Sequence, residues 1–171
     1  MRRHTSRPTE VLIVAVKESA GSTLYGMLDV LNAAGSLWET LSRSGTPHTL
    51  FRVRIAAPSR KSFRCGNNVP VVPDVSIAED PSASIVILPE LWLGPDEDLK
   101  GRYPDLMEWI RRRYRQGAAL YSACSGALML AETGLLDGRE ATSHWGYQDL
   151  FRRCYPKVYM EIGRASCRER V

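Results

Sequence analysis

The sequence lacks the features of a membrane protein, a zinc protein or a secreted disulfide-rich protein. No apolar stretch is long enough to span a bilayer, and no apolar segment follows the basic N-terminus as in a secretory signal. The four cysteines show neither a CxxC spacing nor a zinc-ligand pattern, so we expect no metal, and no motif indicates a cofactor. Without a signal, the expected location is a reducing cytoplasm, with no membrane partner.

The composition is that of one soluble α/β domain with a substantial core. Hydrophobic residues make up 44% of the 171 positions and charged residues 25%. The formal charge is +4, and much of the excess is arginine at the two ends and in residues 111–115. An arginine run is more often a solvated helix face than a binding surface, so this charge is weak evidence for an acidic partner.

Apolar runs and helical patterns alternate along the chain. Strands are predicted at 10–16, 49–57, 84–88 and 119–122, and helices at 24–41, 104–116 and 125–136. Residues 58–80 predict short strands with turns, and a short strand (140–144), a short helix (145–154) and a further strand (156–160) follow. This order predicts a mainly parallel sheet with helices on both faces, a three-layer αβα sandwich.

Ligand sites in such sheets lie beyond the carboxyl ends of the strands. We therefore expect the loops after Val16, Leu88, Ser122 and Ser143 to form the walls of the site.

The segment 119–132 carries the strongest local signal. An apolar run ends in Ser-Ala-Cys-Ser-Gly and passes directly into a helical pattern, which predicts a sharp turn between strand and helix at Cys124. A helix N-terminus favours negative charge, so a cysteine there can have a lowered pKa and be nucleophilic or oxidisable. The alternative is a small buried cysteine that packs the turn.

The two ends of the chain fit no packed element. Residues 1–9 predict a mobile basic tail. Residues 162–171 have no apolar periodicity, interrupt a strand that has just begun, and resemble the translation of a common sequencing adapter. We therefore expect one domain over 10–161, truncated at its C-terminal end, with a genuine polar tail as the alternative.

Three motifs resemble those of a known superfamily. They are Tyr121–Ala127 (YSACSGA), Leu130–Arg139 (LAETGLLDGR) and Ala141–Trp145 (ATSHW). They are similar to the PfpI/ThiJ superfamily, which implies the flavodoxin-like, class I glutamine amidotransferase-like sandwich. More closely, they and Tyr25–Leu31 resemble the N-terminal sensor domain of GlxA-type regulators of the AraC family. The resemblance runs from Val11 to Glu161.

The resemblance also carries expectations about partners. It implies a downstream pair of helix-turn-helix units, lost with the truncation, through which the complete regulator binds DNA. It further implies a homodimer.

Superfamily enzymes use an elbow cysteine, a histidine and an acidic residue, and Cys124 and His144 match the first two. The acidic position falls near Thr23, which has no carboxyl group, and Glu18 is a weak substitute. The Gly-Gly turn whose amides stabilise an oxyanion in the enzymes is replaced by Pro-Glu-Leu-Trp at 89–92. We therefore expect a site that binds rather than transforms its ligand.

The predicted ligand is a small metabolite, held by seven residues above the sheet: Tyr25, Glu90, Trp92, Cys124, Ser125, His144 and Trp145. Two other functions stay open. One is a stand-alone cysteine enzyme, such as a hydrolase, a glyoxalase/deglycase or an isonitrile hydratase-like protein, that uses Cys124 and His144. The other is a thiol redox sensor at Cys124.

Overall fold

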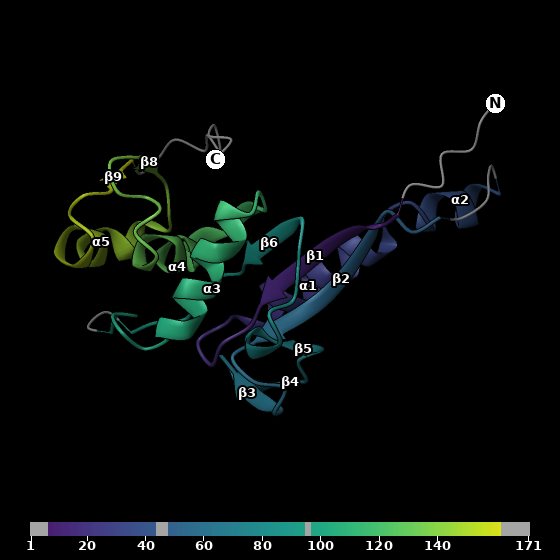
Figure 1. Ribbon diagram of the computed structural model, residues 1–171, viewed down its shortest axis with the longest axis horizontal. Helices are drawn as coiled ribbons and strands as arrows, with labels where there is room; N and C mark the ends of the chain where they lie inside the picture. The colour runs from purple at the N-terminus through teal and green to yellow at the C-terminus, as the bar shows by residue number, and fades with distance from the viewer. Residues whose placement is uncertain (1–6, 44–47, 95–96, 162–171) are drawn as a thin grey trace.

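The centre of the molecule is a five-stranded parallel sheet. The computed structural model describes residues 7–43, 48–94 and 97–161 (Figure 1). The strand order is β5-β2-β1-β6-β7, and every neighbouring pair is parallel. The strands are β1 (Thr9–Val14), β2 (Phe51–Ala57), β5 (Val75–Ser76), β6 (Ile85–Leu88) and β7 (Ala119–Ser122). The predicted α/β class with a mainly parallel sheet is confirmed.

The central strand β1 contributes to both hydrophobic clusters. Its Leu12 and Val14 belong to the larger cluster, which includes residues of α3 (Pro104–Arg115), α4 (Ala127–Glu132) and α5 (Gln148–Cys154). Its Ile13 belongs to the smaller cluster, which includes residues of α1 (Gly21–Ala33). Because successive strand residues point to opposite faces, the sheet has helices on both faces, as predicted.

The first predicted helix is interrupted. The pattern over 24–41 predicts one helix, but the structure has α1 to Ala33 and a separate α2 (Leu37–Ser42). Gly35 lies between them with φ +79°, a left-handed conformation that ends helices and that glycine adopts without steric cost. Apolar spacing alone does not report this break.

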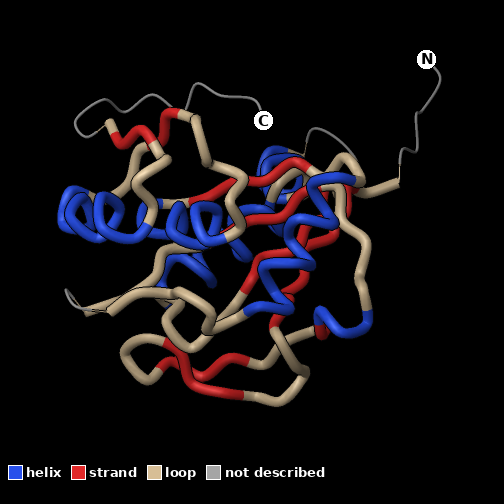
Figure 2. The backbone as a smooth tube through the Cα atoms, turned by 60° about the vertical axis from the view of Figure 1, so that its left-hand side comes forward, coloured by secondary structure: helices blue, strands red, loops and turns tan. Residues whose placement is uncertain are grey.

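The region 58–80 contains the predicted short strands. β3 (Phe63–Cys65) and β4 (Val69–Val71) form an antiparallel hairpin, which lies at the bottom of the molecule in Figures 1 and 2. Asn67 and Asn68 both have positive φ, 56° and 61°, as a tight hairpin turn requires. The short helix η1 (Ile77–Glu79) follows β5.

The C-terminal third forms shorter elements than predicted. The helix predicted over 125–136 begins as η2 (Cys124–Gly126) and ends at Glu132. The strand predicted at 140–144 is only β8 (Glu140–Ala141), and it pairs in parallel with β9 (Tyr159–Met160) in a separate two-stranded sheet. Between them lie η3 (Trp145–Tyr147) and α5. Two predicted segments concern residues outside the described ranges: residues 162–171, and residues 1–6 of the N-terminal tail predicted over 1–9.

Candidate functional site

The chain turns sharply at Cys124, directly after β7. Cys124 has φ +51°, a conformation that few non-glycine residues adopt, and it is exposed. Two residues later Gly126 is packed against the carbonyl groups at the end of β6. A Cβ at this position would collide with the Leu88 carbonyl oxygen and lie 2.7 Å from that of Pro89. The glycine therefore allows the turn to lie close to β6.

The loop after β6 connects the other loops at this edge of the sheet. Leu91 donates its N–H to Ser125 Oγ (2.9 Å), and the same hydroxyl donates to the Leu91 carbonyl (2.7 Å). On its other side, Trp92 donates its N–H to the Glu18 carbonyl (2.7 Å). The Glu90 carbonyl accepts the N–H of Ala20 (2.8 Å). These bonds join the loop after β6 to the loops after β7 and β1.

A fourth segment is attached through Tyr147. Its hydroxyl lies 3.2 Å from the Leu93 N–H and 3.3 Å from the Leu91 carbonyl oxygen. The loops predicted as site walls therefore meet at residues 90–93. Tyr147 and Ser19, whose hydroxyl accepts the N–H of Val16 (3.0 Å), contribute to this arrangement but were not predicted, because a single hydroxyl residue has no sequence signature.

Thr23, the residue predicted near the acidic position of the superfamily enzymes, forms a pair with Glu90. Thr23 Oγ1 donates to Glu90 Oε2 at 2.9 Å. The carboxylate therefore comes from the loop after β6 rather than from the loop after β1. Among the described residues, the Cys124 thiol has no hydrogen bond to Glu90 or to any other group.

The Glu18 carboxylate forms its hydrogen bonds with residues at the start of α3. Its carboxylate accepts hydrogen bonds from Arg102 Nη1 (2.9 Å) and from the Tyr103 hydroxyl (2.7 Å). Burial, followed by this hydrogen bond, raises the pKa of Tyr103 well above its ordinary value. Glu18 therefore links the loop after β1 to the start of α3.

His144 lies on the neighbouring loop, with one ring nitrogen occupied. Its Nδ1 accepts the N–H of Gly146 at 3.1 Å and so caps η3. Its ring centroid is 5.2 Å from that of Trp145 and 6.1 Å from that of Tyr147. The loops of His144 and Cys124 are connected by Ser143 Oγ, which donates to the Cys124 carbonyl at 3.2 Å. The structure brings these loops together without a direct Cys–His hydrogen bond among the described residues.

Two backbone amides of the loop after β6, those of Leu91 and Trp92, are engaged inside the protein. An oxyanion hole needs N–H groups that are free to donate to the reacting oxygen. The N–H groups of Leu91 and Trp92 instead donate to Ser125 Oγ and to the Glu18 carbonyl. In this arrangement neither amide is available to a substrate oxygen.

The predicted aromatic residues lie in different places. Tyr25 donates its hydroxyl to the Pro70 carbonyl (2.8 Å) and packs against the smaller cluster, so its hydroxyl is held by the β3–β4 hairpin. Trp92 is 51% exposed. Its indole lies close to Gly66 of the hairpin, since a Cβ built on Gly66 would lie 3.6 Å from the Trp92 Cγ. Trp145 is 73% exposed. The two tryptophans therefore offer exposed indole surface, whereas the Tyr25 hydroxyl is engaged by the hairpin.

Two kinds of feature were not found in the part of the chain that the structure describes. No group of three or more His, Cys, Asp or Glu side chains there is placed to hold a metal ion. No helix within the same ranges is long and apolar enough to cross a membrane.

Comparison with known proteins identifies the family. The DJ-1/PfpI family model matches residues 10–161, so the chain belongs to the DJ-1/PfpI family, as the motifs around Cys124 predict. An AraC family transcriptional regulator from Pseudomonas putida superposes with a TM-score of 0.66 at 18% identity, over 91% of this chain and 77% of that structure. At this identity the likeness shows the fold.

Curated relatives match shorter segments. The chain is 44% identical over 62 residues to the HTH-type transcriptional regulator CdhR of Pseudomonas aeruginosa, covering 36% of this chain and 18% of that protein. It is 43% identical over 44 residues to isonitrile hydratase of Pseudomonas putida, covering 26% and 19%. Each match thus spans about a fifth of the relative's length.

Proposed function

We propose that this chain is the sensor domain of an AraC-family transcription regulator and binds a small metabolite beside Cys124. The observation that carries the proposal is the engagement of the Leu91 and Trp92 amides within the protein. A loop that uses its N–H groups to join its neighbours suits a fixed binding surface better than acyl-transfer chemistry. The similarity to CdhR supports the regulatory role. DNA binding and self-association are proposed for the complete regulator.

The carboxylate of Glu90, on the loop after β6, favours a cationic ligand. Glu90 is half-buried, and Thr23 donates to only one of its two carboxylate oxygens. The other oxygen has no hydrogen-bond partner among the described residues and is available to an ammonium group. The exposed indoles of Trp92 and Trp145 add apolar surface, and a tryptophan face also attracts cations. Small amines and amino-acid derivatives are therefore the proposed ligand class.

Thermal unfolding in the presence of a panel of primary amines and amino acids tests the proposal. A ligand at about 100 times its Kd adds about 2.7 kcal/mol of stability, which raises Tm by roughly 5–10 °C in a domain of this size. We expect Glu90→Gln to abolish this rise and Glu140→Gln, on an exposed residue of β8, to preserve it. A panel without any shift, or a shift that Glu90→Gln leaves intact, contradicts the proposal.

An enzyme is the second candidate. The exposed Cys124 with its positive φ and the 44-residue match to isonitrile hydratase favour it. Cysteine catalysis requires the thiol, so Cys124→Ala would remove turnover of an isonitrile or of methylglyoxal. Equal rates for Cys124→Ala and the unaltered protein exclude the enzyme and leave the sensor.

A further inference from the structure

The segment 143–147, which follows β8, lies on the surface except at its end. Residues 144–146 are exposed, whereas Tyr147 is half-buried. Among the described residues, two side chains of this segment donate hydrogen bonds to other loops. Ser143 donates to the turn at Cys124, and Tyr147 donates to the loop after β6. The place of this segment at the carboxyl edge of the sheet therefore depends on few contacts.

The Tyr147 hydroxyl is bonded to the backbone of two buried residues. It accepts the N–H of Leu93 at 3.2 Å. It also lies 3.3 Å from the Leu91 carbonyl oxygen and 3.2 Å from that of Leu93, so its single proton is shared between these two acceptors. Leu91 is 1% exposed and Leu93 is 9% exposed. One phenol thus fixes the inward-facing half of the loop after β6.

The other half of the same loop faces the proposed ligand. Glu90 is half-buried and Trp92 is exposed, and they alternate with the buried Leu91 and Leu93. This alternation is that of an extended segment, and Leu91 forms an antiparallel bridge with Ser19. Because neighbouring residues of an extended segment point to opposite sides, a bond that fixes the buried pair also fixes the directions of the exposed pair.

The ring of Tyr147 connects this loop to the second exposed tryptophan. Its centroid is 6.1 Å from that of His144, in a T-shaped arrangement. The His144 ring in turn lies 5.2 Å from the Trp145 ring. Both separations lie in the range of favourable ring contacts. Tyr147 therefore contacts the wall that carries Trp92 through its hydroxyl, and the wall that carries Trp145 through its ring.

We propose that Tyr147 is the positioning residue that sets the spacing between Trp92 and Trp145, the two exposed indoles of the ligand site. It acts through residues 90–93 and through His144, without touching the ligand. This role rests on the function proposed above for the residues beside Cys124. Walls that are fixed before binding spare the ligand the free energy of ordering them, so removal of the hydroxyl weakens binding.

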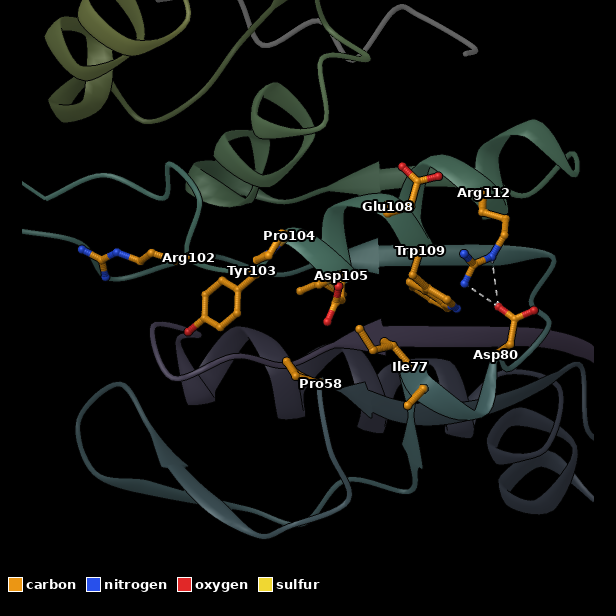
Figure 3. A pocket seen from close by; sticks show the side chains of 12 residues that line it. Pro58, Ile77, Asp80, Arg102, Tyr103, Pro104, Asp105, Glu108, Trp109 and Arg112 are labelled. Atoms are coloured by element: carbon orange, nitrogen blue, oxygen red, sulfur yellow. Dashed lines mark hydrogen bonds and ion pairs between the residues drawn. The ribbon is translucent and has the colours of Figure 1, made fainter.

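Tyr155 supplies the matched control. Its hydroxyl donates to Glu132 of α4 at 2.9 Å rather than to the loop after β6, so Tyr155→Phe removes a bonded hydroxyl without freeing either wall. Tyr103 is unsuitable, because its hydroxyl binds Glu18, whose carbonyl accepts the N–H of Trp92. Tyr103 also lines a separate cavity of about 390 Å³ along α3, which Figure 3 shows.

The indole N–H signals of Trp92 and Trp145 in ¹H–¹⁵N NMR spectra test the proposal first without a ligand. Trp92→Phe and Trp145→Phe identify the two signals. We expect Tyr147→Phe to shift or broaden both signals, because each wall loses its fixed position. Tyr155→Phe should leave both signals in place. Unchanged indole signals in Tyr147→Phe overturn the proposal.

Titration with phenethylamine, followed through the same signals, measures the effect on binding. This probe offers an ammonium group to Glu90 and an aromatic ring to the indoles. We expect Tyr147→Phe to weaken binding by about fivefold or more, and Tyr155→Phe to bind within about twofold of the unaltered protein. Equal weakening by the two variants would assign the effect to lost stability and overturn the proposal.

The proposed function and the role of Tyr147 fail in different ways. If the unaltered protein binds phenethylamine no better than Glu90→Gln does, the function proposed above fails for this ligand, and the spectra of the free proteins still decide whether Tyr147 positions the walls. If Glu90→Gln abolishes binding while Tyr147→Phe binds as the unaltered protein does, the proposed function stands and the role of Tyr147 is overturned.

Discussion

Ser125 is completely buried, and its hydroxyl makes two hydrogen bonds to Leu91, one to the N–H and one to the carbonyl. Its neighbour Cys124 is exposed and makes no side-chain hydrogen bond among the described residues. At the scale of single residues, the serine holds the two loops together and the cysteine faces solvent. The motif that contains both residues predicts that they share a site. Which of them stabilises the loops and which faces solvent depends on which side chain points inward.

We predict that Ser125→Ala destabilises the protein by about 1–3 kcal/mol, because it leaves the buried N–H of Leu91 without an acceptor. Urea unfolding measures the change. Ser82→Ala, at an exposed position without a side-chain hydrogen bond to any described residue, should stay within about 0.5 kcal/mol of the unaltered protein. Similar unfolding curves for the two variants would show that the Ser125–Leu91 bonds contribute little.

At the scale of elements, α3 is attached to the rest of the fold at both ends. Near its start, Arg102 and Tyr103 hold Glu18 of the loop after β1. Near its end, Arg112 and Arg113 donate to Asp80, which follows η1. The helical spacing predicts an inner face of Leu106, Trp109, Ile110 and Tyr114. The first three are buried, whereas Tyr114, in the last turn, is half-buried. The arginine run predicts a solvated face, yet Arg113 is 3% exposed, because Asp80 and the Pro81 carbonyl accept its hydrogen bonds.

The junction between η1 and α3 predicts a pH dependence of stability. The hydrogen bond from Arg112, followed by the charge of Arg113, holds the pKa of Asp80 below its ordinary value of 3.8. A carboxylate with a lowered folded-state pKa stabilises the fold above its unfolded-state pKa, and this contribution disappears as the pH falls through the folded-state pKa. Asp80→Asn should therefore lower the urea midpoint at about pH 6, and its difference from the unaltered protein should shrink as the pH falls below 3.8 and through the folded-state pKa.

Asp149→Asn serves as the control for this pH series, since its carboxylate is 92% exposed and pairs with Arg152 at 3.3 Å. An exposed ion pair of this kind contributes little to the free energy of unfolding. The urea midpoint of Asp149→Asn should therefore match that of the unaltered protein at every pH. A destabilisation by Asp80→Asn that does not change between about pH 6 and pH 3 would mean that its charge is not the cause.

At the scale of the whole molecule, the five-stranded sheet and the β8–β9 pair differ in how well they are covered. Leu12 and Ile13 of β1 are fully buried, and β1 is paired with β2 on one side and β6 on the other. Within the ranges that the structure describes, β8 and β9 pair only with each other, and Glu140 and Tyr159 are exposed. A two-stranded pair with this exposure is stabilised mainly by its contacts with the rest of the domain.

We predict that amide hydrogen exchange separates these regions. The amides of β1 should exchange only through global unfolding, whereas those of β8 and β9 should exchange much faster through local opening. Exchange followed by NMR or mass spectrometry measures both rates on one sample, with β6 as an internal reference for the protected sheet. Equal protection in β1 and β9 would show that the domain opens as a single cooperative unit.

The sequence by itself determined the class of fold and most of its elements. Apolar runs, helical spacing and the Asn67–Asn68 turn are local properties, because burial period and turn geometry depend on residues that are close in the chain. The motifs around Cys124 also identified the family, which the match over 10–161 confirms. Cys124 and His144 were named from these motifs.

Only the tertiary structure decided how the loops at the carboxyl edge of the sheet share their hydrogen bonds. Thr23 and Glu90 are 67 positions apart, and Leu91 and Ser125 are 34 apart, so no periodicity reports either contact. The same holds for Tyr25 and Pro70, which are 45 positions apart. Each polar group takes the nearest partner that folding brings within reach, and that choice depends on sheet order and loop packing rather than on local sequence.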